Sequence, residues 1–122
     1  MFDGHGGSAC SDFLRDHLHR YIIEDPSFPD NIPQAIHRGF MRADEEFIRQ
    51  ASARLTDIEV SGSCAVILLV VDGKAYIGNA GDSRAVMSAN FGEKVQTLSN
   101  DHKPNYLPEK NRVEIGGGSV YK

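Results

Sequence analysis

The stretch Cys64-Ala65-Val66-Ile67-Leu68-Leu69-Val70-Val71-Asp72-Gly73 decides the fold of this chain. Its first part is a nearly continuous aliphatic and β-branched run, which predicts a strand buried on both faces. The Asp-Gly pair that follows favours a two-residue hairpin turn, after which residues 75–79 pair back. Two more short strands are expected at residues 84–87 and 95–98, so this region predicts an antiparallel meander of about four strands.

Helical periodicity marks the segments before and after these strands. One amphipathic helix is expected to begin after Ser8, a plausible N-cap, and to end before Pro26. A second helix is expected to have Pro33 in its first turn, a position that suits proline. A short polar helix is expected from Pro108 to Ile115, and residues 119–122 resemble the opening of another strand. Helices followed by an antiparallel sheet predict an α+β fold with helices layered on one face.

Composition narrows the classes of function. The chain has 122 residues, a mass of 13.4 kDa and a net charge of -4, which fits one domain or part of one. The acidic balance and the lack of any basic run argue against nucleic acid or an anionic membrane as the main partner. No signal peptide is evident, so we expect an intracellular protein of the cytoplasm or nucleus. Cys10 and Cys64 fit neither a disulfide framework nor a metal-ligand spacing, and we expect both to be small buried hydrophobes.

The segment Asp3-Gly4-His5-Gly6-Gly7 is the strongest candidate for chemistry. Asp3 and the Gly4 carbonyl offer the oxygen ligands that a hard divalent cation such as Mg²⁺ or Mn²⁺ prefers. His5 carries the side chain whose ordinary pKa lies nearest to neutral pH, so it is suited to protonate a leaving group. Taken alone, the pentapeptide is more typical of a simple strand-to-helix turn than of a catalytic site.

Four segments form a pattern in chain order: residues 1–7, Ser61-Gly62-Ser63-Cys64-Ala65, Asn79-Ala80-Gly81-Asp82-Ser83-Arg84-Ala85 and Leu98-Ser99-Asn100-Asp101-His102-Lys103-Pro104. Together they resemble one family, the metal-dependent protein Ser/Thr phosphatases known as protein phosphatase 2C. The resemblance implies part of an α-β-β-α sandwich, with antiparallel sheets flanked by helices and truncated at both ends. Residues 1–122 would then be a partial catalytic domain. Cys64 stands where the family usually has threonine.

The resemblance also implies a mechanism and a set of site residues. Asp3 would bridge two Mg²⁺ or Mn²⁺ ions, the Gly4 carbonyl would coordinate one of them, and His5 would be the general acid. Asp82 matches an aspartate at an additional, weaker metal site, although an Asx bond that shapes the turn is an equally good interpretation. A metal-bridging water would attack the phosphorus of a phosphoserine or phosphothreonine in a phosphoprotein substrate.

Other polar residues of these segments have structural interpretations. We expect Arg84 to tie down its turn, and Asp101-His102 to cap and order a loop.

The sequence also leaves a non-catalytic interpretation open. Family members carry further metal ligands upstream and downstream that this sequence lacks, and Asp3 with one carbonyl cannot hold two ions that each want about six oxygens. Residues 1–122 alone are therefore expected to show little or no phosphatase activity. The alternative is a module of the same fold that binds phosphoproteins or a partner without turnover. The presence of both Asp3 and His5 favours the enzyme, and a different metallohydrolase is a weaker third possibility.

Overall fold

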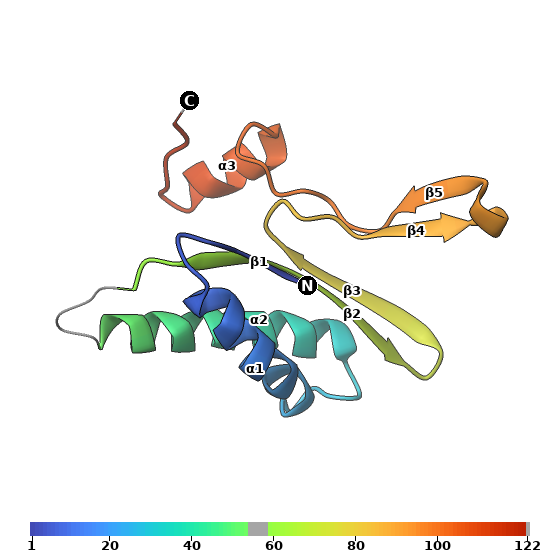
Figure 1. The fold of residues 1–122 in the computed structure, drawn as a ribbon, viewed down its shortest axis with the longest axis horizontal. Coiled ribbons are helices and arrows are strands. Elements are labelled where there is room, and N and C mark those ends of the chain that lie inside the picture. Colours follow the sequence, from blue (N-terminus) through green and yellow to red (C-terminus); the bar gives the residue numbers. More distant parts are fainter. Residues whose placement is uncertain (54–58, 122) are drawn as a thin grey trace.

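The computed structural model describes residues 1–53 and 59–121. Within them the chain forms two antiparallel sheets and three α-helices, which confirms the α+β class (Figure 1). In chain order the elements are β1 (Phe2–His5), α1 (Ala9–Ile23), α2 (Ile32–Ser52), β2 (Gly62–Val71), β3 (Lys74–Ala80), β4 (Val86–Ala89), the 3₁₀ turn η1 (Asn90–Gly92), β5 (Lys94–Thr97) and α3 (Leu107–Ile115).

The first sheet has the order β1-β2-β3 and contains the predicted hairpin. Asp72 and Gly73 both have positive φ, 49° and 73°, as a type I′ turn requires. The prediction of one four-stranded meander is wrong, because β4 and β5 pair with each other in a separate sheet (Figure 1). The chain between β3 and β4 hydrogen-bonds instead to the segment after β5, as in the bond from the His102 amide to the Gly81 carbonyl.

Strand β2 is covered on one face, and the prediction of burial on both faces is wrong. Alternate residues point to opposite faces of a strand, and Ile67 and Leu69 pack against the helical core. On the other face, Leu68 and Val70 are 65% and 62% exposed. The described residues place both long helices against one side of this sheet, so the aliphatic run is only half covered.

Helices α1 and α2 lie as predicted and enclose the core. Helix α1 ends at Ile23, before Pro26, and α2 has its proline in the first turn. The Asn31 side chain caps α2 by accepting a hydrogen bond from the Gln34 amide at 3.2 Å. The buried core comprises Phe13, Leu18, Ile22, Ile32, Ala35, Ile36 and Ala43.

Three smaller sequence predictions have mixed outcomes. Helix α3 begins one residue before the predicted start, at Leu107. Residues 119–121 form no strand, and Lys122 lies outside the described residues, so the predicted final strand is wrong where it can be checked. Both cysteines are free but only half-buried. Burial and then the nearby carboxylates of Asp44 and Glu59 raise the pKa of the Cys10 thiol.

No helix of the described chain combines the length and the apolar character needed to cross a bilayer.

Candidate active site

Strand β1 carries the Asp3-Gly4-His5 segment along the edge of the first sheet. The sequence favoured a turn here, but the strand continues through His5 and the turn comes after it, at Gly6 and Gly7 with φ of 69° and 141°. The register pairs Asp3 with Cys64 and His5 with Gly62. β1 therefore presents these residues beside the start of β2 (Figure 1).

Asp3 and Asp82 lie on either side of Cys64. Phe2 packs towards the helical core, so Asp3, the next residue of the strand, points to the opposite face of the sheet with its cross-strand neighbour Cys64. The Cys64 thiol donates a hydrogen bond to Asp82 Oδ1 at 3.4 Å. The fold thus places each of two carboxylates, far apart in the sequence, beside Cys64. Both sequence interpretations of Asp82, a metal ligand and a turn-shaping residue, stay predictions.

Gly4 is placed with its carbonyl free of the sheet. The Met1 amino group donates to the Val66 carbonyl at 2.7 Å, and the Val66 amide donates to the Met1 carbonyl at 2.9 Å. Antiparallel ladders alternate, so these exchanges fall on odd-numbered residues of β1 and the Gly4 carbonyl points out of the sheet edge. On the helical side, a Cβ at Gly4 would lie 2.8 Å from Ser11 Oγ. A larger residue at this position would therefore require the Ser11 side chain to move.

The turn that carries Asp82 is held by the segment after β5. The Asn79 side-chain amide donates to the Asn100 carbonyl at 2.8 Å and to the Gly81 carbonyl at 3.3 Å. The Ala85 amide donates to Ser99 Oγ at 2.9 Å. Residues 79–85 and 98–104, two motifs that lie about twenty residues apart, are thus joined by hydrogen bonds into one unit, called the clasp below. The clasp fixes the position of Asp82.

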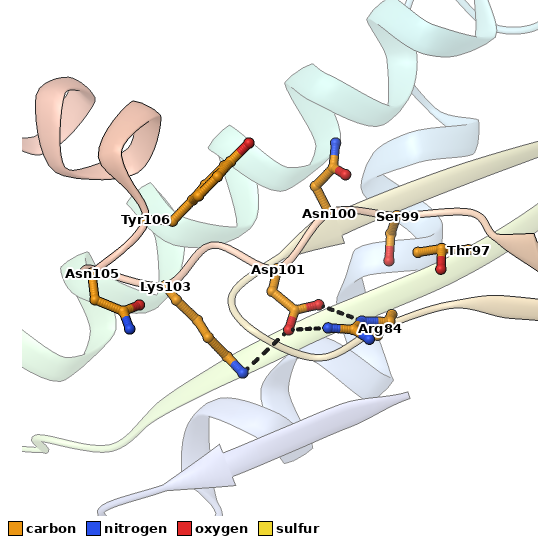
Figure 2. A pocket seen from close by; sticks show the side chains of 8 residues that line it. All are labelled: Arg84, Thr97, Ser99, Asn100, Asp101, Lys103, Asn105 and Tyr106. Atoms are coloured by element: carbon orange, nitrogen blue, oxygen red, sulfur yellow. Dashed lines mark hydrogen bonds and ion pairs between the residues drawn. The ribbon is translucent and has the colours of Figure 1, made fainter.

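Asp101 anchors the same clasp through two cations. Figure 2 shows its carboxylate between Arg84 and Lys103. Arg84 donates to it twice, each time at 2.8 Å, and the Lys103 ammonium lies 3.3 Å away. Hydrogen bonding from Arg84 lowers the pKa of Asp101 to about 2. The predicted structural role of Arg84 agrees with this geometry. Asp101 orders the loop as expected, but it does so by an ion pair rather than as a helix cap.

Sequence reasoning missed how helix α1 is capped. Ser8 occupies the N-cap position, but its side chain makes no capping hydrogen bond. Instead, the buried Ser61 accepts a hydrogen bond from the Cys10 amide at 3.0 Å. A cap supplied from fifty-one residues away leaves no local signal in the sequence. It ties the helix that follows His5 to the residues that lead into β2.

The comparisons with known proteins agree with this arrangement. The family model described as Protein phosphatase 2C matches residues 1–122. The chain belongs to the protein phosphatase 2C family. It is similar to "Probable protein phosphatase 2C 27" of Arabidopsis thaliana, at 41% identity over 121 residues, which are 99% of this chain and 30% of that protein. It is also similar to "Probable protein phosphatase 2C member 13, mitochondrial" of Oryza sativa subsp. japonica, at 37% identity over 98% of this chain and 32% of that protein.

A solved structure supports the same fold. The crystal structure of serine-threonine phosphatase 2C from Toxoplasma gondii aligns with a TM-score of 0.83 at 26% identity, covering 98% of this chain and 44% of that chain. The protein phosphatase 2C chain described here therefore spans about a third of the length of the two relatives named above.

The residues of this chain supply the type of ligand that a metal site of the family needs, but too few of them. Protein phosphatase 2C enzymes are metal-dependent, and Asp3, Gly4 and Asp82 supply oxygen donors, as hard divalent cations require. Across residues 1–53 and 59–121, however, no group of three or more His, Cys, Asp or Glu side chains is placed to hold an ion. These residues would supply part of a coordination sphere, and the roles of Asp3, Gly4, His5 and Asp82 stay predictions.

Proposed function

We propose that the protein is a metal-dependent protein serine/threonine phosphatase and that residues 1–122 form part of its catalytic domain. The observation that carries the proposal is the patch at the β1 edge. There, the Asp3 and Asp82 carboxylates flank Cys64, the Gly4 carbonyl points outward, and the exposed His5 lies two residues further along β1. The membership of the family supports the same activity.

Each residue of the patch has a distinct role in this proposal. Asp3, the Gly4 carbonyl and Asp82 hold Mg²⁺ or Mn²⁺ together with ligands from outside this chain. When bound, the ions supply an acidified water as nucleophile and neutralise the phosphoryl oxygens. His5 donates a proton to the seryl or threonyl oxygen as its bond to phosphorus breaks, since an alkoxide is a poor leaving group. The substrate is a phosphoprotein, and we place the protein in the cytoplasm or nucleus.

Two substitutions test these roles in the full-length natural protein. Turnover of a phosphoserine peptide with Mn²⁺ or Mg²⁺ is measured for Asp3→Asn and His5→Gln. The controls are Asp30→Asn and His37→Gln, which change exposed residues of the same types outside the patch. Loss of the general acid lowers turnover by about 10²–10⁴-fold. Asp3→Asn should also raise the metal concentration needed for half-maximal activity. Metal-independent turnover, or full activity of both variants, would refute the proposal.

The incomplete ligand set favours a second function, a non-catalytic module that binds phosphoproteins or a partner. It is favoured by the absence, among the described residues, of a third metal-binding side chain near Asp3 and Asp82. Phosphopeptide binding by the natural protein without turnover at any metal concentration would support it. A polypeptide limited to residues 1–122 is expected to be inactive under either function.

A further inference from the structure

The imidazole of His5 lies over a residue that has no side chain. His5 and Gly62 are cross-strand partners in the β1–β2 ladder. A Cβ placed on Gly62 would lie 2.4 Å from His5 Nε2, 2.9 Å from Cε1 and 3.3 Å from Cδ2. The ring therefore occupies the space that any side chain at position 62 would fill.

The backbone around this contact is held from two directions. On the β2 side, Ser61 bonds the α1 amide of Cys10 through its hydroxyl, and its own amide donates to Glu59 Oε1 at 2.9 Å. On the β1 side, Gly7 follows the strand so closely that a Cβ there would lie 3.3 Å from Ser61 Cβ. All three atoms nearest to an added Cβ at position 62 belong to the His5 ring and none to the β1 backbone. A methyl group at position 62 must then displace the imidazole rather than the backbone.

We propose that Gly62 is a positioning residue for His5. Because Gly62 has no side chain, the imidazole can pack directly against its α-carbon, and this contact sets the position and orientation of the ring relative to the sheet. The inference rests on the proposed function, in which His5 is the general acid. Gly62 itself touches neither substrate nor metal in this proposal. Its effect passes through the ring that rests on it.

The position of the His5 ring can be tested by comparing two substrates whose leaving groups differ in their need for a proton. As water forms its bond to phosphorus, the bond from phosphorus to the seryl oxygen breaks and its electron pair stays on that oxygen. The oxygen then takes the proton from an imidazole nitrogen of His5. A p-nitrophenolate leaving group is stable without that proton, so the same hydrolysis of p-nitrophenyl phosphate does not need the acid. A displaced His5 should slow the first substrate and spare the second.

The test compares Gly62→Ala with His5→Gln and with Gly116→Ala, in the protein with its natural ends and saturating Mn²⁺. Gly116 is the matched control, because its φ of -73° is ordinary and an added Cβ would meet only carbonyl oxygens at 3.4 Å. Misplacement by about 1 Å costs on the order of 10²-fold in rate, so Gly62→Ala should lower phosphoserine-peptide turnover about 10–100-fold. Turnover of p-nitrophenyl phosphate should change by less than about threefold. The double variant Gly62→Ala/His5→Gln should be no slower than His5→Gln.

The outcomes distinguish the general-acid role of His5 from the positioning role of Gly62. If His5→Gln slows both substrates equally or neither, the general-acid role fails, and the proposed function fails with it in that respect. If His5→Gln shows the leaving-group selectivity and Gly62→Ala does not, the positioning role alone is overturned. A parallel loss of both turnover rates in Gly62→Ala, or loss of its folded circular dichroism signal, also overturns it. In that case the strain would have fallen on the backbone. The His5 ring resonances in NMR should shift in Gly62→Ala and stay unchanged in Gly116→Ala.

Discussion

Replacing Gly39 by alanine sets two known effects against each other. Gly39 lies inside α2, where alanine is favoured over glycine by about 1 kcal/mol because it restricts the unfolded chain. Yet Gly39 is also buried at the point where α2 crosses α1. A Cβ there would lie 2.5 Å from Ile22 Cγ1 and 3.2 Å from the Ile22 backbone nitrogen.

The magnitude follows from what the new methyl group meets. Ile22 is itself buried, and its Cγ1 makes the closest contact, but its backbone nitrogen at 3.2 Å is a second, tighter than usual one, so a rotamer change relieves only part of the strain. Overpacking of this kind costs about 1–3 kcal/mol, and the backbone contact puts it in the upper part of that range. After the gain in helix propensity, Gly39→Ala should lower the free energy of unfolding by about 1–2 kcal/mol.

Urea denaturation followed by circular dichroism measures the change. With a typical slope of about 2 kcal/mol/M, the midpoint should fall by roughly 0.5–1 M. In an Ile22→Ala background, which removes Cγ1, the same substitution should cost less, and the double-mutant cycle gives the coupling energy. A rise in midpoint for Gly39→Ala, or an identical cost in both backgrounds, would refute the reasoning.

Two further predictions concern the segments around the candidate site. Ser61→Ala removes the cap on the Cys10 amide and should lower the free energy of unfolding by about 0.5–2 kcal/mol. Ser8→Ala, measured by the same urea titration, should have a smaller effect because Ser8 makes no capping bond. The pKa of Asp101 is about 2 in the folded chain and higher when unfolded. Its ion pair therefore stabilises the clasp above about pH 4, and this contribution is lost as the pH falls towards 2. The protection factors of the Asn100 and His102 amides, which correct for the intrinsic exchange rate at each pH, should fall over that interval, and in Asp101→Asn they should be low already at pH 5.

The helices and the hairpin could be predicted because their signals are local. Apolar residues three and four apart define α1 and α2, and Pro33 marks where the second helix begins. Asp72-Gly73 encodes its own turn through the two positive φ angles. Each of these features depends on neighbours within a few residues, and each is found where the sequence places it.

The errors arise where distant segments decide the conformation. The glycines of the Asp3–Gly7 segment suggested a turn, but pairing with residues 62–65 extends β1 through His5. Leu68 and Val70 have the composition of buried residues, yet burial depends on what packs above them, and the described helices cover the other face. The link between Cys64 and Asp82 likewise exists only after β2 and β3 have paired and the turn after β3 is in place.

The partnership of β1 with β2 also sets an order of events during synthesis. The Met1 amino group and the Val66 carbonyl are 65 residues apart, and the whole α1–α2 pair lies between them. Proteins emerge from the ribosome N-terminus first, and helical pairs with local contacts form quickly, whereas strands joined over long separations form slowly. The residues of β1, which include Asp3 and His5, are translated before residues 62–66 and therefore stay unpaired until those residues have emerged. Newly made chains should acquire their helical core before they acquire the strand that carries the proposed chemistry.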